Sequence, residues 1–395
     1  MRLPIILMII IILLNIGVDY FINRILLNSN KNRCWSRVYS IFSITITLGV
    51  VVVISLPRRS GSDATLLFVM WMLFSYFSIY IPRYFYVIFK FLSLLPQLWK
   101  KRKWSNVPYI GVAIGIFSFL LMWWGALVNR YNIEINEVSV EVIDLPQSFD
   151  GYRIAQISDL HLGTFNNDTT FVTELVDAIN KANVDAVMFT GDIVNRKSSE
   201  LLPFEKILSR IKAKDGVFSI LGNHDYGDYA DWNSQNEKDA NLKLMHDIQQ
   251  RINWKLLLNQ TAYIFRGSDS IAVVGVENVG DPPFKIYGSL DEAYDMINDS
   301  KTKILLTHNP AHWEKDIKNN QDSNIALTLS GHTHAMQISV CGLSPSIFRY
   351  ECWSGLYTDK FNQNLYVNVG VGTVAMPMRI GATPEITILT LKKLN

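Results

Sequence analysis

The sequence Ser330-Gly331-His332-Thr333-His334 directly follows an apolar run at residues 325–329, which predicts a buried strand. Two histidines one residue apart, on the turn after a strand, can direct their rings towards one point. Four other polar motifs also follow short apolar, β-branched runs: Asp159-Leu160-His161, Gly191-Asp192, Gly222-Asn223-His224-Asp225 and Thr307-His308. Polar clusters at five strand ends predict one metal site along the carboxyl edge of an α/β sheet.

The segments between these motifs have the periodicity of alternating strands and helices. Residues 152–157 and 184–190 are predicted strands, and residues 171–182 between them have helical spacing. Such a β-α-β unit implies parallel strands and a right-handed crossover. Asp159, Asp192 and Asn223 then fall roughly thirty residues apart, one in each repeat.

Further elements are predicted on both sides of this core. Residues 138–143, 216–221, 263–265, 271–276 and 304–307 are expected strands, and residues 365–369 and 386–391 are late strands that add a second sheet. Residues 205–211, 242–258 and 291–298 are expected helices. His246 is interpreted as an ordinary helical side chain, and His312 is left out of the metal site because Asn309-Pro310 makes a turn before it.

The motifs supply seven candidate metal ligands that carry oxygen or nitrogen and no thiolate. They are Asp159, His161, Asp192, Asn223, His308, His332 and His334. This mixture favours Mn, Fe or Zn over calcium, which prefers oxygen alone, and over a structural zinc site, which usually contains cysteine. Seven ligands are too many for one ion, but they suit two divalent ions bridged by a carboxylate. Such a pair acidifies a bridging water and holds a phosphoryl group for in-line displacement.

The front of the chain has a different character. Residues 3–18, 38–56, 64–81 and 107–128 are apolar runs close to the roughly 20 residues that cross a bilayer. Four such runs leave no polar surface for a soluble domain, so we expect residues 1–130 to form a bundle of about four transmembrane helices. The first run is interpreted as a retained anchor, because no small-x-small cleavage site precedes Asp19.

Pro82 and Arg83 are expected to interrupt the third run. The aromatic segment at residues 84–99 then lies along the interface, extends the third helix at a tilt, or crosses separately. The basic cluster at residues 100–103 directly precedes the fourth run and favours a cytoplasmic position there. The fourth helix would then carry residues 131–395 to the outer side. Apart from Asp19 and Arg83 these runs hold no charge, which argues against a transporter.

Charge divides the chain in the same way. Residues 1–130 contain 14 Lys and Arg and two acids, a net charge of 14 − 2 = +12, which leaves 23 − 33 = −10 for residues 131–395. An acidic half argues against a nucleic-acid partner, which needs a basic face. Of the three cysteines, Cys341 and Cys352 could pair in an oxidising compartment or remain free thiols.

Taken in order, D-x-H, G-D, G-N-H-D, H and G-H-x-H resemble the calcineurin-like metallophosphoesterases, over about residues 138–395. The stretches at residues 149–154, 370–373 and 384–387 are similar to its bacterial membrane-associated branch, which includes phosphodiesterases and a lipid A pathway UDP-diacylglucosamine pyrophosphatase. The resemblance implies a four-layer α-β-β-α sandwich of two mixed sheets for residues 131–395. It also assigns the ligands: Asp159, His161 and His334 at the first ion, Asp192 bridging, and Asn223, His308 and His332 at the second.

The resemblance implies roles for two further residues. His224 stays off the metals and protonates the leaving oxygen, while Asp225 orients its ring. Relatives often have two glycines after the final histidine, where this chain has Ala335-Met336. This departure leaves the ligands in place but affects the adjoining loop and hence access of the substrate.

These observations predict a phosphoesterase anchored in a bacterial inner membrane, with its catalytic half outside the cytoplasm. The expected substrate contains a phosphodiester or pyrophosphate bond and can be lipid-linked. The main alternative is a cytoplasm-facing pyrophosphatase of the UDP-diacylglucosamine type. A non-catalytic, metal-binding membrane sensor or scaffold is a third reading, although the chain lacks none of the family's ligands.

Overall fold

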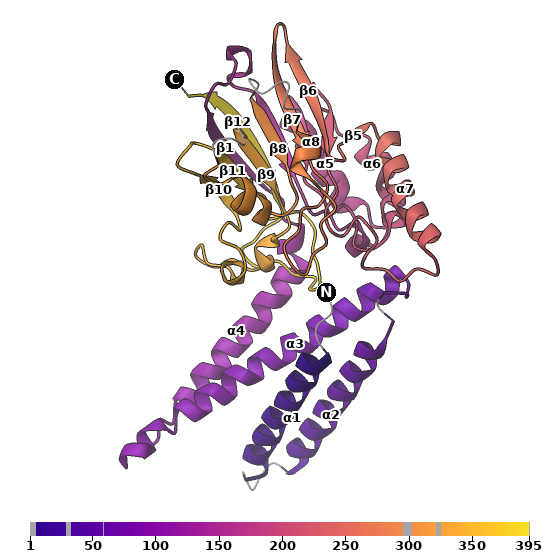
Figure 1. Ribbon diagram of the computed structural model, residues 1–395. Helices are drawn as coiled ribbons and strands as arrows, with labels where there is room; N and C mark the ends of the chain where they lie inside the picture. The colour runs from indigo at the N-terminus through magenta and orange to yellow at the C-terminus, as the bar shows by residue number, and fades with distance from the viewer. Residues whose placement is uncertain (1–4, 29–32, 58, 295–301, 321–324, 395) are drawn as a thin grey trace. The chain divides into compact units, whose positions relative to one another are not determined.

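The computed structural model describes residues 5–28, 33–57, 59–294, 302–320 and 325–394 (Figure 1). The chain forms two compact units. One contains residues 1–128 and 375–378, and we call it the helical unit. The other contains residues 129–374 and 379–395, and we call it the sheet unit.

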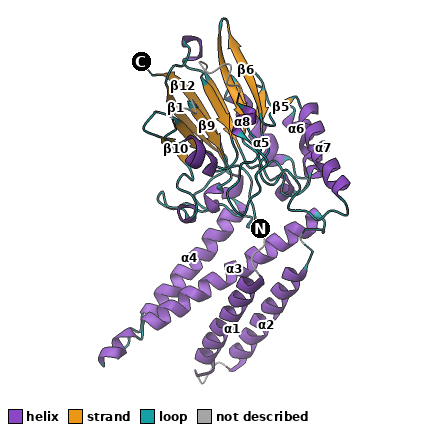
Figure 2. Cartoon of the chain, viewed as in Figure 1, coloured by secondary structure: helices purple, strands orange, loops and turns teal. Residues whose placement is uncertain are grey.

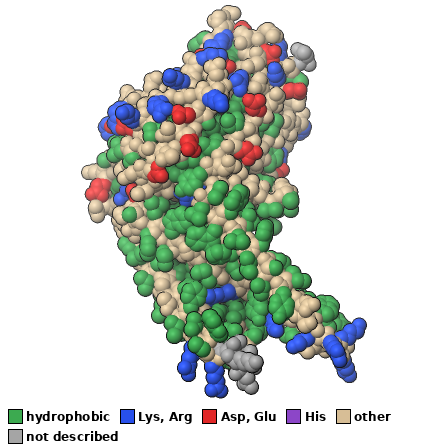
Figure 3. All heavy atoms as spheres, turned by 180° about the vertical axis from the view of Figure 1, so that it is seen from behind, with side chains coloured by type: hydrophobic (Ala, Val, Ile, Leu, Met, Phe, Trp, Pro, Cys, Tyr) green, Lys and Arg blue, Asp and Glu red, His purple; other side chains and the backbone are tan. Residues whose placement is uncertain are grey.

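The helical unit is built from four long helices. They are α1 (Ile5–Asn28), α2 (Arg33–Ser55), α3 (Asp63–Leu92) and α4 (Val107–Leu127). All four are long and apolar enough to cross a membrane. At 1.5 Å per residue, even a helix of about 20 residues spans the roughly 30 Å hydrocarbon core. Hydrophobic side chains predominate on the face of this unit seen in Figure 3, as expected for a surface that contacts lipid.

The expected interruption at Pro82 is wrong, because α3 continues through it to Leu92. A proline inside a helix removes one hydrogen bond and crowds the preceding turn, so packing must offset the cost. Here α4 approaches closely through two glycines four residues apart: a Cβ on Gly115 would lie 3.0 Å from Pro82 O, and one on Gly111 would lie 2.7 Å from Phe85 O. Small residues at this spacing let membrane helices pack tightly. The aromatic segment after Pro82 therefore extends the third helix instead of crossing separately.

The sheet unit contains two mixed, six-stranded sheets. In spatial order, the first contains β1 (Glu134–Val142), β12 (Glu385–Lys393), β2 (Arg153–Ile157), β3 (Ala186–Phe189), β4 (Val217–Ser219) and β5 (Trp254–Leu256). The second contains β10 (Gly355–Thr358), β11 (Asn364–Val367), β9 (Leu327–Ser330), β8 (Lys303–Leu306), β7 (Asp269–Gly275) and β6 (Gln260–Arg266). Strands β2 to β5 are parallel, as are β7, β8, β9 and β11.

Alternating side chains join each sheet to two layers of core. In β3, Ala186 and Met188 pack between the sheets, whereas Val187 and Phe189 face the helices. This is the period of two expected of a strand buried on both faces. The outer face of the first sheet is covered by α5 (Thr170–Lys181), α6 (Glu205–Leu208) and α7 (Gln235–Arg251). The second sheet is covered more thinly, by α8 (Leu290–Ala293) and a helical turn at Trp313–Ile317 (Figure 2). The expected α/β class with outer helices is confirmed.

Some predicted elements differ from the observed ones. The two late strands do not share a sheet, because β12 inserts between β1 and β2 while β11 pairs with β9. The helix expected at residues 242–258 is instead α7 followed by β5, with Asn253 in a left-handed conformation (φ 61°) between them. The helix expected at residues 291–298 is shorter, because α8 ends at Ala293 and Tyr294 is extended; residues 295–298 lie outside the described residues. Cys341 is exposed and Cys352 buried, and both are free thiols.

Candidate metal centre

The seven candidate ligands come from the carboxyl ends of five strands. Asp159, Asp192 and Asn223 follow β2, β3 and β4 of the first sheet, while His308 and His332 follow β8 and β9 of the second. Two sheets therefore supply the ligands, not the single edge predicted from the strand-end pattern. Neighbouring parallel strands end at the same edge of their sheet, and the two packed sheets bring both edges together.

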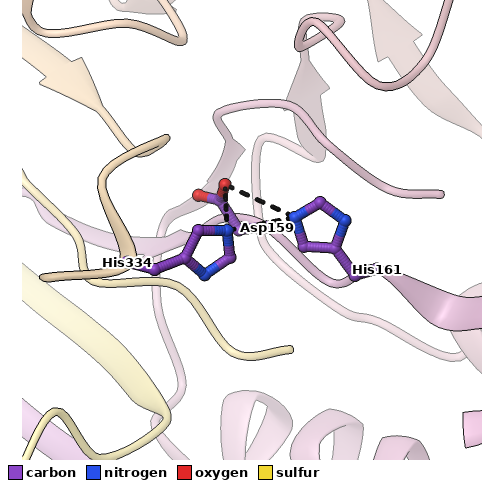
Figure 4. A group of neighbouring side chains, drawn as sticks. All are labelled: Asp159, His161 and His334. Carbon is purple, nitrogen blue, oxygen red and sulfur yellow. Dashed lines mark hydrogen bonds and ion pairs between the residues drawn. The ribbon is translucent and has the colours of Figure 1, made fainter. Parts of the chain in front are cut away.

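Asp159, His161 and His334 form the first group (Figure 4). His334 Nε2 lies 3.2 Å from Asp159 Oδ1 and 3.1 Å from His161 Nε2. His161 Nε2 is 3.9 Å from the same carboxylate oxygen. All three side chains are buried, so their nitrogen and oxygen atoms converge on one point away from solvent.

Asp192, His308 and His332 form the second group. His308 Nε2 lies 3.2 Å from Asp192 Oδ2 and 3.1 Å from His332 Nδ1. His308 Nδ1 donates to the carbonyl oxygen of Thr190 at 2.8 Å, which leaves Nε2 as the acceptor towards the group. Asp192 Oδ2 is also 3.7 Å from His161 Nε2 of the first group. One carboxylate oxygen therefore reaches both groups.

The backbone at five of these ligands is left-handed. Asp159 has φ 54°, His161 45°, Asp192 60°, His332 73° and His334 50°. Non-glycine residues rarely adopt positive φ, and such strain concentrates at functional sites. The side chains converge because the chain turns sharply after each strand, not because alternate residues share a face.

Two motif glycines are required by close approach. A Cβ on Gly331 would lie 2.3 Å from Asp159 Oδ2, and one on Gly222 would lie 2.2 Å from Asp192 Oδ1. Any side chain at either position would displace a candidate ligand. The glycines of G-H-x-H and G-N-H-D therefore let the turns from neighbouring strands meet over the site.

The donor atoms fit divalent cations. Asp159 Oδ1 and Asn223 Oδ1 are buried and have no hydrogen-bond donor, an arrangement that is costly unless a cation takes the donor's place. Burial acts to raise the pKa of Asp192, but His308 and His224 hold it well below its usual value. Burial lowers the pKa of His332 to about 3, whereas Asp192 outweighs burial at His308 and raises its pKa to about 9. A cation bound here would displace the His308 proton, as metals do at imidazole ligands.

The expected role of Asp225 needs correction. Its carboxylate does not orient the His224 ring; it accepts from the backbone N–H groups of Asp192, Ile193, Val194 and Gly222 at 2.8–3.2 Å. His224 Nδ1 instead lies 2.7 Å from the carbonyl oxygen of Asn195, to which it donates. Burial and Asp192 raise the pKa of Asp225, while the Gly222 and Val194 N–H groups act in the opposite direction. Asp225 thus ties together the two loops that carry Asp192 and His224.

Two residues beside the site were not predicted. Tyr229 accepts a hydrogen bond from Asn223 Nδ2 at 2.9 Å, which directs Asn223 Oδ1 inward, and its ring stacks on His224 with centroids 4.0 Å apart. The buried guanidinium of Arg379 has Nη2 3.3 Å from His334 Nδ1. In the sequence, Tyr229 is indicated only weakly, as an aromatic residue soon after G-N-H-D. No local sequence pattern indicates Arg379. His312 is bonded to Thr307 at 2.9 Å, and His246 is half-buried on α7.

The loop after His334 carries avoidable strain. Ala335 and Met336 have φ 49° and 44°, where an L-residue is about 1–2 kcal/mol less favourable than in its usual regions. Met336 is 45% exposed, so Met336→Gly loses little packing, although glycine adds entropy to the unfolded chain. We expect a net stabilisation of about 0.5–1 kcal/mol, seen as a higher midpoint of thermal unfolding.

Leu343→Gly is the matched control for Met336→Gly, because Leu343 is also exposed (66%) but has no left-handed backbone. It should lower the midpoint. Equal shifts in both variants would show that left-handed strain is not what limits this loop.

The candidate ligands lie in a part of the chain that matches a known family. Residues 152–336, which carry every candidate ligand, match the family of the calcineurin-like phosphoesterases. The chain therefore contains a calcineurin-like metallophosphoesterase domain. Residues 1–130 match the family described as "Probable Calcineurin-like phosphoesterase, transmembrane domain". Both parts of the chain thus match families whose descriptions refer to calcineurin-like phosphoesterases.

Several individual proteins are similar to this chain. A transmembrane protein with metallophosphoesterase domain from Danio rerio is 28% identical over 286 residues, which are 70% of this chain and 62% of that protein. An uncharacterized metallophosphoesterase of Bacillus subtilis (strain 168) is 29% identical over 281 residues, or 68% of this chain and 88% of that protein. A solved dimetal phosphatase from Danio rerio is 12% identical with a TM-score of 0.31, covering 56% of this chain and 88% of that one.

Proposed function

We propose that this protein is a membrane-anchored, two-metal phosphoesterase that hydrolyses phosphodiester or pyrophosphate bonds. The observation that carries the proposal is the position of Asp192, whose Oδ2 lies 3.2 Å from His308 Nε2 and 3.7 Å from His161 Nε2. A carboxylate between two sets of nitrogen and oxygen donors is the arrangement that bridges a pair of ions. Asp159, His161 and His334 would hold one ion, and Asn223, His308 and His332 the other.

Divalent ions at these positions would supply an activated water and neutralise the charge of a phosphoryl group. The residues of the chain provide the remaining functions. His224 uses Nδ1 for its hydrogen bond to Asn195 O, so Nε2 is left to protonate the leaving oxygen.

The proposed orientation puts the sheet unit outside the cytoplasm. The loop between α1 and α2 is flanked by Arg24, Arg33 and Arg37 in the two helices, and the loop between α3 and α4 contains the basic cluster at residues 100–103. If each helix crosses once, both loops lie on one side, which their charge favours as the cytoplasmic side. The continuous α3 supports this count of four crossings. The end of α4, and the sheet unit that follows it, then lie on the extracytoplasmic side. The membrane in this proposal is a bacterial inner membrane.

Access favours a substrate in or near the membrane. A tethered site meets lipid-linked phosphodiesters and pyrophosphates at high local concentration. The net charge of −10 on residues 131–395 disfavours polyanionic polymers such as nucleic acids. We therefore propose a lipid-linked phosphodiester or pyrophosphate as the substrate class.

The enzymatic proposal is tested with the full chain in detergent, stripped of metal by a chelator. Hydrolysis of bis(p-nitrophenyl) phosphate and of p-nitrophenyl phosphate is measured before and after addition of Mn²⁺, Zn²⁺ or Fe²⁺. We expect metal-dependent cleavage that is faster for the diester. No turnover of either ester, with two metals bound per chain, would favour the non-catalytic sensor.

Orientation is tested separately by fusing reporters after Asn395. Active alkaline phosphatase at this position supports an extracytoplasmic sheet unit. A bright fluorescent protein would instead support the cytoplasm-facing alternative.

A further inference from the structure

A cleft of about 360 Å³ lies between α1 and α2 of the helical unit. Its size is within the range of small-molecule sites. Ten side chains from these two helices line it: Ile16, Asp19, Tyr20, Asn23, Tyr39, Ser40, Ser43, Ile44, Thr47 and Leu48. Polar side chains are rare in membrane-spanning helices and mark function when they gather. The metal centre makes no use of this cleft.

The one acidic side chain in the cleft is fully engaged. Asp19 Oδ1 accepts from Arg83 Nη1 at 2.5 Å and from the Tyr39 hydroxyl at 2.6 Å, and Oδ2 accepts from the Tyr80 hydroxyl at 2.7 Å. Arg83 belongs to α3 and also donates to Ser43 at 3.1 Å. The carboxylate is thus neutralised by its own helix bundle, so it neither repels an anion nor remains available to bind a cation.

The mouth of the cleft is basic. Arg24 at the end of α1, and Arg33 and Arg37 at the start of α2, are all exposed. Lys and Arg side chains gather at one end of the helical unit in Figure 3. Within residues 1–130 the sequence has only one other acid, Asp63, and it begins α3 at the far end of α2. The field at this mouth is therefore positive.

The lining changes in order from the mouth inwards. Next to the basic side chains, Asn23 donates to Ser40 at 3.0 Å, forming a level of amide and hydroxyl groups. One to two helical turns further along α1 and α2 the lining is more apolar, with Ile16, Ile44 and Leu48 beside the hydroxyls of Ser43 and Thr47. A phospholipid has its groups in the same order along the membrane normal: the phosphate first, then ester and hydroxyl groups, then the acyl chain.

We propose that this cleft binds one anionic, phosphate-bearing membrane lipid. Arg24 and Arg37 hold its phosphate, the level of Asn23 and Ser40 contacts its ester or hydroxyl groups, and one acyl chain lies against Ile44 and Leu48. Each basic side chain beside a membrane strengthens the binding of an anionic lipid about fivefold. The lipid would fix α1 against α2 and so set the stability of the bundle.

The same chemistry occurs in a resident phospholipid and in a lipid-linked phosphoester of the kind proposed as substrate. The mouth is at the loop between α1 and α2, whereas α4 ends at the other end of the bundle, where the chain continues to the sheet unit. A lipid in the cleft is therefore in the leaflet away from the proposed catalytic side. This position favours the resident anionic phospholipid.

The test uses native mass spectrometry of the full chain in detergent. Dioleoylphosphatidylglycerol is titrated beside dioleoylglycerol, which has the same acyl chains and a hydroxyl but no phosphate. We expect one phosphatidylglycerol per chain, bound at least about tenfold tighter than dioleoylglycerol. A polyprenyl diphosphate is added in competition: failure to displace phosphatidylglycerol supports the resident lipid, and full displacement at equimolar amounts overturns that choice.

Two variants separate the cleft from general attraction to lipid. Ile44→Phe fills the cleft without removing a polar group, and Ile41→Phe is its control, because Ile41 is exposed on α2 outside the lining. The pair Arg24→Gln and Arg37→Gln removes the charge at the mouth and should weaken binding about 20-fold. We expect Ile44→Phe to lose the bound lipid and Ile41→Phe to keep it.

Equal binding to Ile44→Phe and Ile41→Phe would overturn the proposal, as would dioleoylglycerol binding as tightly as phosphatidylglycerol. The midpoint of thermal unfolding, measured on the same preparations, shows that each variant is folded. Because binding is read by mass, its failure is distinguishable from failure of the proposed hydrolysis.

Discussion

Replacement of Asp192 by asparagine is expected to lower the rate of ester hydrolysis about 10³-fold or more, the largest effect of any single substitution considered. Oδ2 of Asp192 lies within 3.7 Å of a nitrogen from each ligand group. An amide keeps the shape but loses the negative charge that two adjacent cations require. Loss of one cation removes several kcal/mol of transition-state stabilisation, and each 1.36 kcal/mol corresponds to a tenfold change in rate.

The measurement pairs steady-state hydrolysis with the metal content per chain. Asparagine retains an oxygen that can accept from the His224 N–H, which now lies 2.8 Å from Asp192 Oδ1, so the loop should stay in place. Asp177→Asn is the control, because Asp177 is an exposed acid on α5 that pairs with Arg210. Two metals and near-normal hydrolysis in Asp192→Asn would rule out Asp192 as the carboxylate that bridges the proposed ions.

The sequence was sufficient to predict the convergence of the ligands because it depends on strand ends. An apolar run that ends in a polar motif, as before Asp159 and His332, locates a carboxyl edge from local information alone. The sheet to which a strand belongs is not local information. Strand β12 pairs with β2, which lies more than two hundred residues earlier, through residue pairs such as Leu389 with Ile154. The hydrophobic periodicity of the two strands does not predict that they are neighbours.

Backbone conformation and hydrogen-bond partners also could not be predicted from the sequence. The left-handed turns at Asp159 and His161 are held by tertiary contacts such as the bond from Asp159 N to Gly191 O at 2.9 Å. Adjacency in G-N-H-D suggested that Asp225 orients His224, yet its carboxylate finds backbone donors in the neighbouring loop. Similarly, Pro82 predicted a break because the glycines of α4 that accommodate it lie elsewhere in the chain.

Replacement of His224 by alanine is expected to lower kcat about 10²- to 10⁴-fold. This is the usual contribution of a positioned general acid. The ring is fixed on two sides, by the 2.7 Å hydrogen bond from Nδ1 to Asn195 O and by stacking on Tyr229. It lies edge-on to the ligand His161, with ring centroids 4.9 Å apart. Nε2 is therefore held beside the metal centre, and the deletion removes a proton donor without removing a predicted ligand.

The decisive measurement is the dependence of this loss on the leaving group. A p-nitrophenolate leaves without protonation, whereas an alkoxide of the kind released from a lipid ester needs a proton, so His224→Ala should impair an alkyl diester far more than an aryl diester. His246→Ala is the matched control, a half-buried histidine on α7 outside the site. Equal losses with both esters at full metal content would mean that His224 positions the substrate and that another group protonates the leaving oxygen. A loss confined to the alkyl ester would assign that proton to His224, because no ligand or structural role distinguishes the two leaving groups.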